Sequence, residues 1–190
     1  MEELVSRLVD ATIGDTFNFY REGDAAGTRR NRLIDYLHAR EGAPLLLVGE
    51  APGYRGTRVS GIPFTSERQL TGTGPGEASA TIVHRVLAEL GIEKDVLLWN
   101  VVPTHPGTAC SNRRPTRAEV EASLPFLLEV GRGRLTIAVG RLAHAALGDP
   151  YVRHPSHGGA SAFELGIRDC VSGPPVGASC GTPPPLAVKP

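Results

Sequence analysis

Residues 45–56 read Leu45-Leu46-Leu47-Val48-Gly49-Glu50-Ala51-Pro52-Gly53-Tyr54-Arg55-Gly56, a run of branched apolar side chains that breaks into a turn carrying one carboxylate. A short apolar run of this kind is typical of a strand buried on both faces, as in a parallel sheet. Such sheets bind ligands just beyond the carboxyl ends of their strands. Glu50 occupies that position, and Gly49 and Gly53 let the backbone approach a ligand closely. Taken alone, the stretch also fits an ordinary strand exit with a solvated glutamate.

Similar apolar runs bounded by turn residues predict three more strands, at residues 95–102, 135–140 and 151–153. Apolar residues at helical spacing predict helices within the first forty residues and over 79–90, 116–130, 141–147 and 160–167. The Gly-rich segment 61–76 and the segment 107–115 are expected to be loops. This alternation of strands and helices indicates an α/β fold, with helices on both faces of a parallel sheet.

The chain of 190 residues has the length of one compact domain. We expect that domain to span residues 1–171, and the Pro- and Gly-rich composition of residues 172–190 predicts a disordered tail. No apolar run approaches membrane-spanning length, and the N-terminus lacks the pattern of a signal peptide, so a cytoplasmic location is expected. The formal net charge is zero, so a nucleic-acid partner would be held by local basic patches.

The cysteine pattern argues against a disulfide framework and against a cysteine-bound metal centre. There are three cysteines, Cys110, Cys170 and Cys180, and no two of them form a Cys-x-x-Cys pair. A four-cysteine zinc or iron–sulfur site needs more thiols than the chain has. We therefore predict buried or incidental thiols and no metal or other cofactor.

Functional side chains follow three of the predicted strands. Glu50 ends the first strand, and Phe64 lies in the loop after it. Asn100 ends the second strand, and His154 and His157 follow the fourth. Each alone is weak evidence, since single histidines and asparagines usually form structural hydrogen bonds. The carboxyl ends of parallel strands meet at one edge of a sheet, however, so we expect these side chains to line one cleft.

These groups suit the removal of a planar base from a sugar. An aromatic face such as that of Phe64 stacks on a ring, and the amide of Asn100 presents a donor and an acceptor to the edge of an imide such as uracil. A histidine can stabilise an oxyanion as a leaving base takes up negative charge. A carboxylate can orient water or stabilise a cationic sugar. The set predicts cleavage of the N-glycosidic bond of a flipped pyrimidine nucleotide.

The same residues resemble the motifs of the uracil-DNA glycosylase superfamily, over roughly residues 44–168. Gly49-Glu50-Ala51-Pro52-Gly53 matches the first motif of its bacterial and archaeal thermostable-type branch, and Pro63-Phe64 resembles the uracil-stacking phenylalanine. Asn100 matches the asparagine that reads the uracil edge, and Asn112-Arg113-Arg114-Pro115 resembles the loop after it. His154-Pro155-Ser156 matches the second motif, whose histidine contacts the base.

This resemblance implies a three-layer α/β/α sandwich with a four-stranded parallel sheet. It also implies a monofunctional, monomeric uracil-DNA glycosylase of base-excision repair, which hydrolyses uracil or another deaminated base from DNA without a cofactor and releases the free base. The implied catalytic residues are Glu50, which positions water or stabilises the sugar cation, Asn100, and His154, which stabilises the departing base. The implied base-binding residues are Gly49, Ala51, Gly53, Phe64 and Asn100. The implied DNA contacts are Arg113, Arg114, Ser156 and His157.

The chain departs from this family pattern at several points. The thermostable-type branch carries four cysteines for an iron–sulfur cluster, and further acidic residues where this chain has Tyr54-Arg55-Gly56. The loop after the second motif normally supplies a bulky apolar wedge that fills the space left by the flipped base, whereas here it reads His157-Gly158-Gly159-Ala160. Without a wedge, opening a duplex is costly, so we predict a preference for single-stranded or mismatched DNA unless His157 acts as the wedge.

Two other functions are compatible with the sequence. The neutral net charge and the missing wedge fit a member of the superfamily that binds uracil or nucleic acid with little or no turnover. The Gly-rich loop also fits a nucleotide-binding α/β protein of unrelated chemistry. That loop lacks the Lys-Ser/Thr ending of a phosphate-binding P-loop, which counts against this last interpretation.

Overall fold

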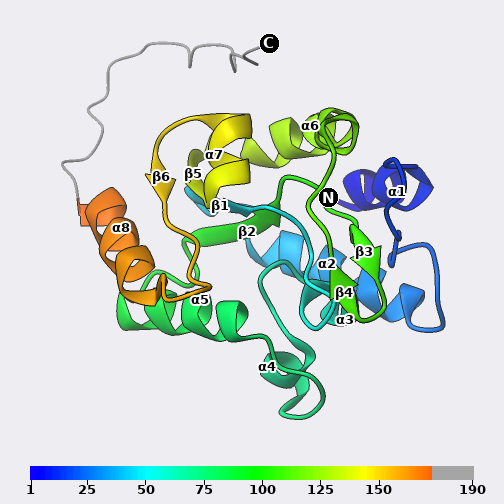
Figure 1. Cartoon of the computed structure of the whole chain (residues 1–190), viewed down its shortest axis with the longest axis horizontal. Coiled ribbons are helices and arrows are strands. Elements are labelled where there is room, and N and C mark those ends of the chain that lie inside the picture. The colour runs from blue at the N-terminus through cyan, green and yellow to red at the C-terminus, as the bar shows by residue number, and fades with distance from the viewer. Residues whose placement is uncertain (173–190) are drawn as a thin grey trace.

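A computed structural model describes residues 1–172 of the chain, and the predicted disordered tail falls almost wholly outside them. In chain order the elements are α1 (Glu2–Asp10), α2 (Ala26–Ala39), β1 (Leu45–Gly49), α3 (Thr57–Ser60), α4 (Glu67–Thr71), α5 (Ala78–Glu89), β2 (Val96–Asn100), β3 (Gly107–Thr108), β4 (Ser111–Asn112), α6 (Arg117–Gly131), β5 (Leu135–Val139), α7 (Arg141–Leu147), β6 (Tyr151–Val152) and α8 (Ala160–Ser172). Figure 1 shows how these elements are arranged around a central sheet.

The central sheet has four strands in the order β2-β1-β5-β6, and all neighbouring strands are parallel. In the pairing of β1 with β2, Leu45 lies opposite Val96 and Gly49 lies opposite Asn100, so both strands end at the same level. The four predicted strands and the parallel arrangement are therefore confirmed.

Helices cover both faces of this sheet, as Figure 1 shows. Leu46 and Val48 point into one core, which is built with residues of α1, α2, α6 and α7. Leu47 points into the other core, together with Val83 and Val86 of α5 and Phe163 of α8. Because side chains alternate along a strand, β1 supplies both cores and must be apolar throughout. The chain thus forms the predicted three-layer α/β/α sandwich.

The structure differs from the sequence-based expectation in the two segments predicted as loops. The first, residues 61–76, contains the short helix α4, where the Ser66 backbone N–H donates to the side chain of Gln69 at 2.8 Å and closes the first turn. The second, residues 107–115, contains the antiparallel pair of β3 and β4. Both prediction errors concern elements of five residues or fewer, whose patterns are too short to show a period.

The described residues contain no helix that is both long enough and apolar enough to cross a membrane. They also contain no cluster of three or more histidine, cysteine or acidic side chains arranged to hold a metal ion. Cys110 is exposed and Cys170 is partly buried, and both are free thiols.

Candidate active site

The carboxyl ends of β1, β2 and β6 meet at one edge of the sheet, and the predicted side chains gather there. Glu50, Phe64, Asn100 and His154 line one small cavity. An adjoining cleft of about 500 Å³ shares Glu50 and His154 with this cavity and extends past Ser156. The convergence expected from the strand ends is present.

Gly49, the last residue of β1, allows two of these side chains to approach the strand. A Cβ atom at Gly49 would lie 2.3 Å from the Phe64 ring and 3.1 Å from the Asn100 side-chain oxygen. Real Cβ atoms do not tolerate the first distance, so any larger residue would displace the ring. The glycine of the first motif therefore makes room for the stacking face and the amide side by side.

Phe64 is buried in a strained backbone conformation with a φ of 52°. For a residue other than glycine this left-handed region costs about 1 kcal/mol or more, which neighbouring contacts must offset. The Ser60 hydroxyl donates to the Thr65 carbonyl at 2.6 Å and accepts the Ile62 N–H at 3.1 Å. The Thr65 hydroxyl in turn contacts a ring nitrogen of His84 at 3.0 Å. This network fixes the turn that presents the aromatic ring to the cavity.

Asn100 is only 4% exposed. Among residues 1–172 no side chain or carbonyl forms a hydrogen bond with its amide group, and the side chain borders the cavity. A buried amide normally has partners, because desolvating it without them costs free energy. An unpaired amide that borders a cavity is arranged to pair with a ligand.

The ring of His154 is held in one tautomer by the residue that follows Pro155. The Ser156 backbone N–H donates to Nδ1 of His154 at 3.2 Å, and the Ser156 hydroxyl lies 2.8 Å from the same atom. Because Nδ1 accepts, the proton of the neutral ring is on Nε2. Burial lowers the pKa of His154, and the nearby His157 lowers it further. The cavity therefore faces a neutral imidazole whose free nitrogen is a hydrogen-bond donor.

Glu50 is half-buried at the junction of the cavity and the larger cleft. Burial raises the pKa of its carboxyl group, and the positive charge of Arg114 opposes that rise. A carboxylate in this position can accept a hydrogen bond from water or face a cationic sugar.

The two arginines predicted to contact DNA have different environments. The Arg113 guanidinium forms a bidentate salt bridge with the buried Glu119. It also donates to the Asp15 carbonyl at 3.0 Å. Arg114 is exposed and close enough to influence Glu50. Arg113 thus lines the cleft while it is bound within the fold. Arg114 does not line the cleft, but its charge lies near Glu50.

Ser156 and His157, the other predicted DNA contacts, are linked to His154. The Ser156 hydroxyl lies between Nδ1 of His154 and Nδ1 of His157, at 2.8 and 3.0 Å. His157 is exposed and has a φ of 51°, so its side chain stands on a sharp turn at the rim of the cleft. Ser156 therefore orients the ring of His154, in addition to its predicted role as a DNA contact.

Glu77 is a wall residue of this cavity that the sequence did not single out. It lines the same cavity as Glu50 and Asn100, and burial raises the pKa of its carboxyl group. It immediately precedes α5, where an acidic residue is ordinarily explained by the helix dipole. Its position in sequence, well beyond the first motif, gave no signal that the chain folds it back over Gly53.

Comparisons with a family model and with a curated relative both match this chain to uracil-DNA glycosylases. Residues 37–168 match the family model described as the uracil DNA glycosylase superfamily. A type-4 uracil-DNA glycosylase of Pyrobaculum aerophilum is 34% identical over 107 residues, which are 54% of this chain and 47% of that protein. The alignment thus spans about half the length of that relative.

The fold has a counterpart among solved structures as well. The crystal structure of wild-type Pedobacter heparinus SMUG2 superimposes with a TM-score of 0.63 at 14% identity, covering 90% of this chain and 95% of the other. At that identity the likeness concerns the fold alone. The match of the family model over most of the described residues settles the relationship: this chain belongs to the uracil-DNA glycosylase superfamily.

Proposed function

We propose that this chain is a monofunctional DNA glycosylase of base-excision repair, which hydrolyses the N-glycosidic bond of uracil or another deaminated base. The observation that carries the proposal is the shared cavity of Glu50, Phe64, Asn100 and His154. It combines a stacking ring, an unpaired amide, an imidazole N–H and a carboxylate, and the P. aerophilum relative named as a uracil-DNA glycosylase supports the assignment.

In this proposal the base enters the cavity after its nucleotide has rotated out of the strand. Its ring stacks on Phe64, and its imide edge pairs with the amide of Asn100, which can donate and accept at once. A base without that edge would leave the buried amide unsatisfied. Such unpaired polar groups give strong discrimination between ligands.

Bond cleavage follows from the two remaining groups. As the bond from the base nitrogen to the sugar C1′ breaks, its electron pair leaves with the base, and negative charge grows on the base carbonyl oxygen. The Nε2–H of His154 donates to that oxygen and stabilises the charge. Glu50 faces the electron-deficient sugar, orients the water whose oxygen bonds to C1′ and accepts the proton that this water loses, while the departing base anion takes up a proton from solvent. The products are a free base and an abasic site.

DNA is the proposed partner, and the mouth of the cleft carries positive charge to meet it. Arg141 lines the cleft, and Arg114 stands near Glu50. Such exposed cations bind phosphates without sequence preference and hold the strand over the cavity. Arg113 acts indirectly, because its contact with Glu119 fixes the loop from which Arg114 projects.

A second candidate is a superfamily member that binds uracil or nucleic acid with little turnover. It is favoured by the segment after His154, where His157, Gly158 and Gly159 provide no large apolar wedge. Without a wedge the strand opens less readily, because unstacking a base costs a few kcal/mol. Both candidate functions use the same base pocket, but only the first predicts cleavage of the glycosidic bond.

One assay separates them. Labelled oligonucleotides containing a single uracil are incubated with the protein and then heated in alkali, which breaks the strand only at an abasic site. Strand scission that is lost in Glu50→Ala, Asn100→Ala and His154→Ala supports the glycosylase. Binding to the same oligonucleotides without scission, at any protein concentration, would support the second candidate.

A further inference from the structure

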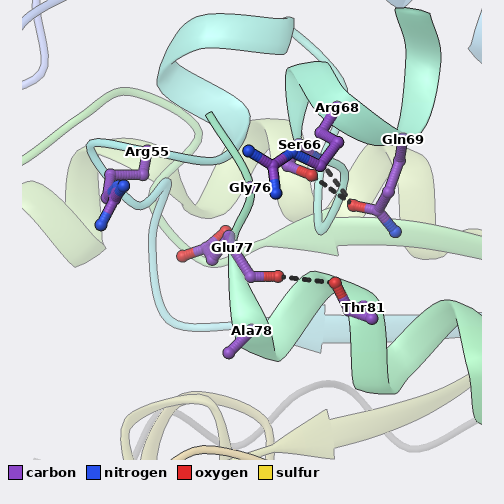
Figure 2. A pocket seen from close by; sticks show the side chains of 8 residues that line it. All are labelled: Arg55, Ser66, Arg68, Gln69, Gly76, Glu77, Ala78 and Thr81. Atoms are coloured by element: carbon purple, nitrogen blue, oxygen red, sulfur yellow. Dashed lines mark hydrogen bonds between the residues drawn. The ribbon is translucent and has the colours of Figure 1, made fainter. Parts of the chain in front are cut away.

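Glu77 forms a partition between two cavities. On one side it lines the cavity that holds Glu50, Asn100 and His154. On the other side it lines an open pocket of about 250 Å³ whose walls include Arg55 and Arg68. Figure 2 shows Glu77 in this outer pocket, between Arg55 on one side and the α4 side chains on the other.

The carboxylate of Glu77 occupies space that side chains of the 53–56 turn would otherwise fill. A Cβ atom at Gly53 would lie 2.2 Å from Glu77 Oε1, and one at Gly56 would lie 1.8 Å from Oε2. Both distances are far below contact distance, so the turn tolerates no side chain at either position while the carboxylate stays in place. The wall of the inner cavity at this turn is therefore supplied by Glu77 from the start of α5.

The side chain of Glu77 has no other structural task within residues 1–172. It provides no side-chain cap for α5 and forms no salt bridge with the described residues. Its backbone carbonyl, not its carboxylate, accepts the Thr81 hydroxyl at 3.1 Å (Figure 2). A half-buried carboxylate without a partner does not stabilise the fold, because its desolvation is uncompensated.

We propose that Glu77 is a specificity-determining residue, which sets the size limit of the base pocket and excludes pyrimidines that carry a substituent at C5. This proposal rests on the proposed function. If the imide edge of a pyrimidine pairs with Asn100 and its O2 faces His154, the C5–C6 side is left to the remaining wall of the cavity, which includes Gly53 and Glu77. A methyl or hydroxymethyl group at C5 would meet the carboxylate there.

Shortening the side chain would join the two cavities. In Glu77→Ala the barrier between the inner cavity and the outer pocket is gone, and a C5 substituent can extend toward Arg55 and Arg68. One added carbon in a closed pocket is commonly worth about tenfold or more in discrimination. The expected change is therefore a rise of about tenfold in the rate on C5-substituted bases relative to uracil.

The experiment compares kcat/KM for release of uracil, thymine and 5-hydroxymethyluracil from otherwise identical single-stranded oligonucleotides. Glu77→Ala should raise the ratio of substituted base to uracil. Glu77→Gln, which keeps the volume and removes the charge, should leave it near the wild-type value. The double variant Gly53→Ala/Glu77→Ala places a methyl group where the carboxylate stood and should restore part of the selectivity.

Two results would overturn the proposal: an unchanged ratio in Glu77→Ala, or a shift in Glu77→Gln as large as in Glu77→Ala. A purely structural role is detected separately, since it would lower the thermal stability and the rates on all three bases together. The equilibrium affinities of each variant for the three free bases measure the selectivity of the same pocket without requiring turnover. If the wild-type protein releases no base at all, the proposed function fails, while the binding ratio still decides the role of Glu77.

Discussion

The cleft at the strand ends and the cluster around Glu119 both contain buried or half-buried polar side chains, but within residues 1–172 these are unpaired in the cleft and paired in the cluster. In the cleft, the amide of the buried Asn100 and the carboxylate of the half-buried Glu77 have no hydrogen-bond partner among the described residues. The carboxylate of Glu119, by contrast, is fully paired. It accepts from Arg113, from the Thr116 N–H at 2.8 Å and from the Asp15 N–H at 3.2 Å.

The difference separates the functional groups of the cleft from the structural groups of the cluster around Glu119. A satisfied buried network holds elements together, here the start of α6, the loop after β4 and the segment before Phe17. An unsatisfied group lowers stability until a ligand pairs with it. Variants in the cleft should therefore change turnover with little effect on stability, and variants in the cluster should do the reverse.

The largest effect is expected from His154→Ala. Loss of a single donor to a developing oxyanion commonly lowers kcat by about 100-fold or more. Single-turnover release of uracil from an oligonucleotide measures this. Thermal unfolding should change less than turnover, because the hydrogen bonds that the ring makes within residues 1–172 go only to Ser156, close by in sequence. If His154→Ala keeps wild-type turnover, the claim that the cleft residues serve catalysis is contradicted.

The matching structural variant is Glu119→Ala. It removes the partner of Arg113 and the Glu119 half of the capping box of α6, so we expect a loss of about 2 kcal/mol in the free energy of unfolding. Urea denaturation measures that loss, and kcat at saturating DNA should stay within a few-fold of wild type. A large fall in kcat without destabilisation would mean that the cluster belongs to the site after all.

A smaller effect is expected at the rim of the cleft, in the preference for single-stranded over duplex DNA. Since the turn at His157 offers no apolar wedge, we expect kcat/KM on single-stranded uracil DNA to exceed that on a matched duplex by about tenfold. A U·G mismatch should fall between them. Equal rates on single strands and on a matched U·A duplex would show that His157 or another group opens the helix.

The smallest effect concerns acid stability. The hydrogen bonds from Arg113, helped by those from Thr116 and Asp15, lower the pKa of Glu119 from 4.5 to about 2. The unfolded chain therefore takes up this proton first, so the stabilisation is complete above pH 4.5 and declines as the pH falls toward 2. The difference in unfolding free energy between wild type and Glu119→Gln should shrink below pH 4.5, and a constant difference would contradict this account.

Much of the fold and the centre of the cleft could be predicted from the sequence. The apolar run of β1 and the parallel arrangement follow from burial on both faces, and the strand ends then place Glu50, Asn100 and His154 together. These residues are near their strands in sequence, so a local pattern was enough to locate them.

The rest depended on contacts between distant segments. Glu77 reaches the cavity because the segment with α3 and α4 folds back over Gly53, and no local pattern encodes that return. The resemblance implied that Arg113 contacts DNA, and nothing in the local sequence showed that its guanidinium pairs with Glu119. Whether an arginine binds a partner or its own fold is decided by the acid that tertiary structure places beside it.

The most direct measurement is the mass-spectrometric detection of free base after incubation of single-stranded uracil DNA with the wild-type protein and with Asn100→Ala. Because the unpaired amide of Asn100 is arranged to hold the base, the account predicts free uracil from the wild-type protein and about 100-fold less from the variant, with both proteins equally stable. Equal release from both, or a variant that loses activity only by unfolding, would contradict the claim that the unsatisfied groups of the cleft are there for the substrate.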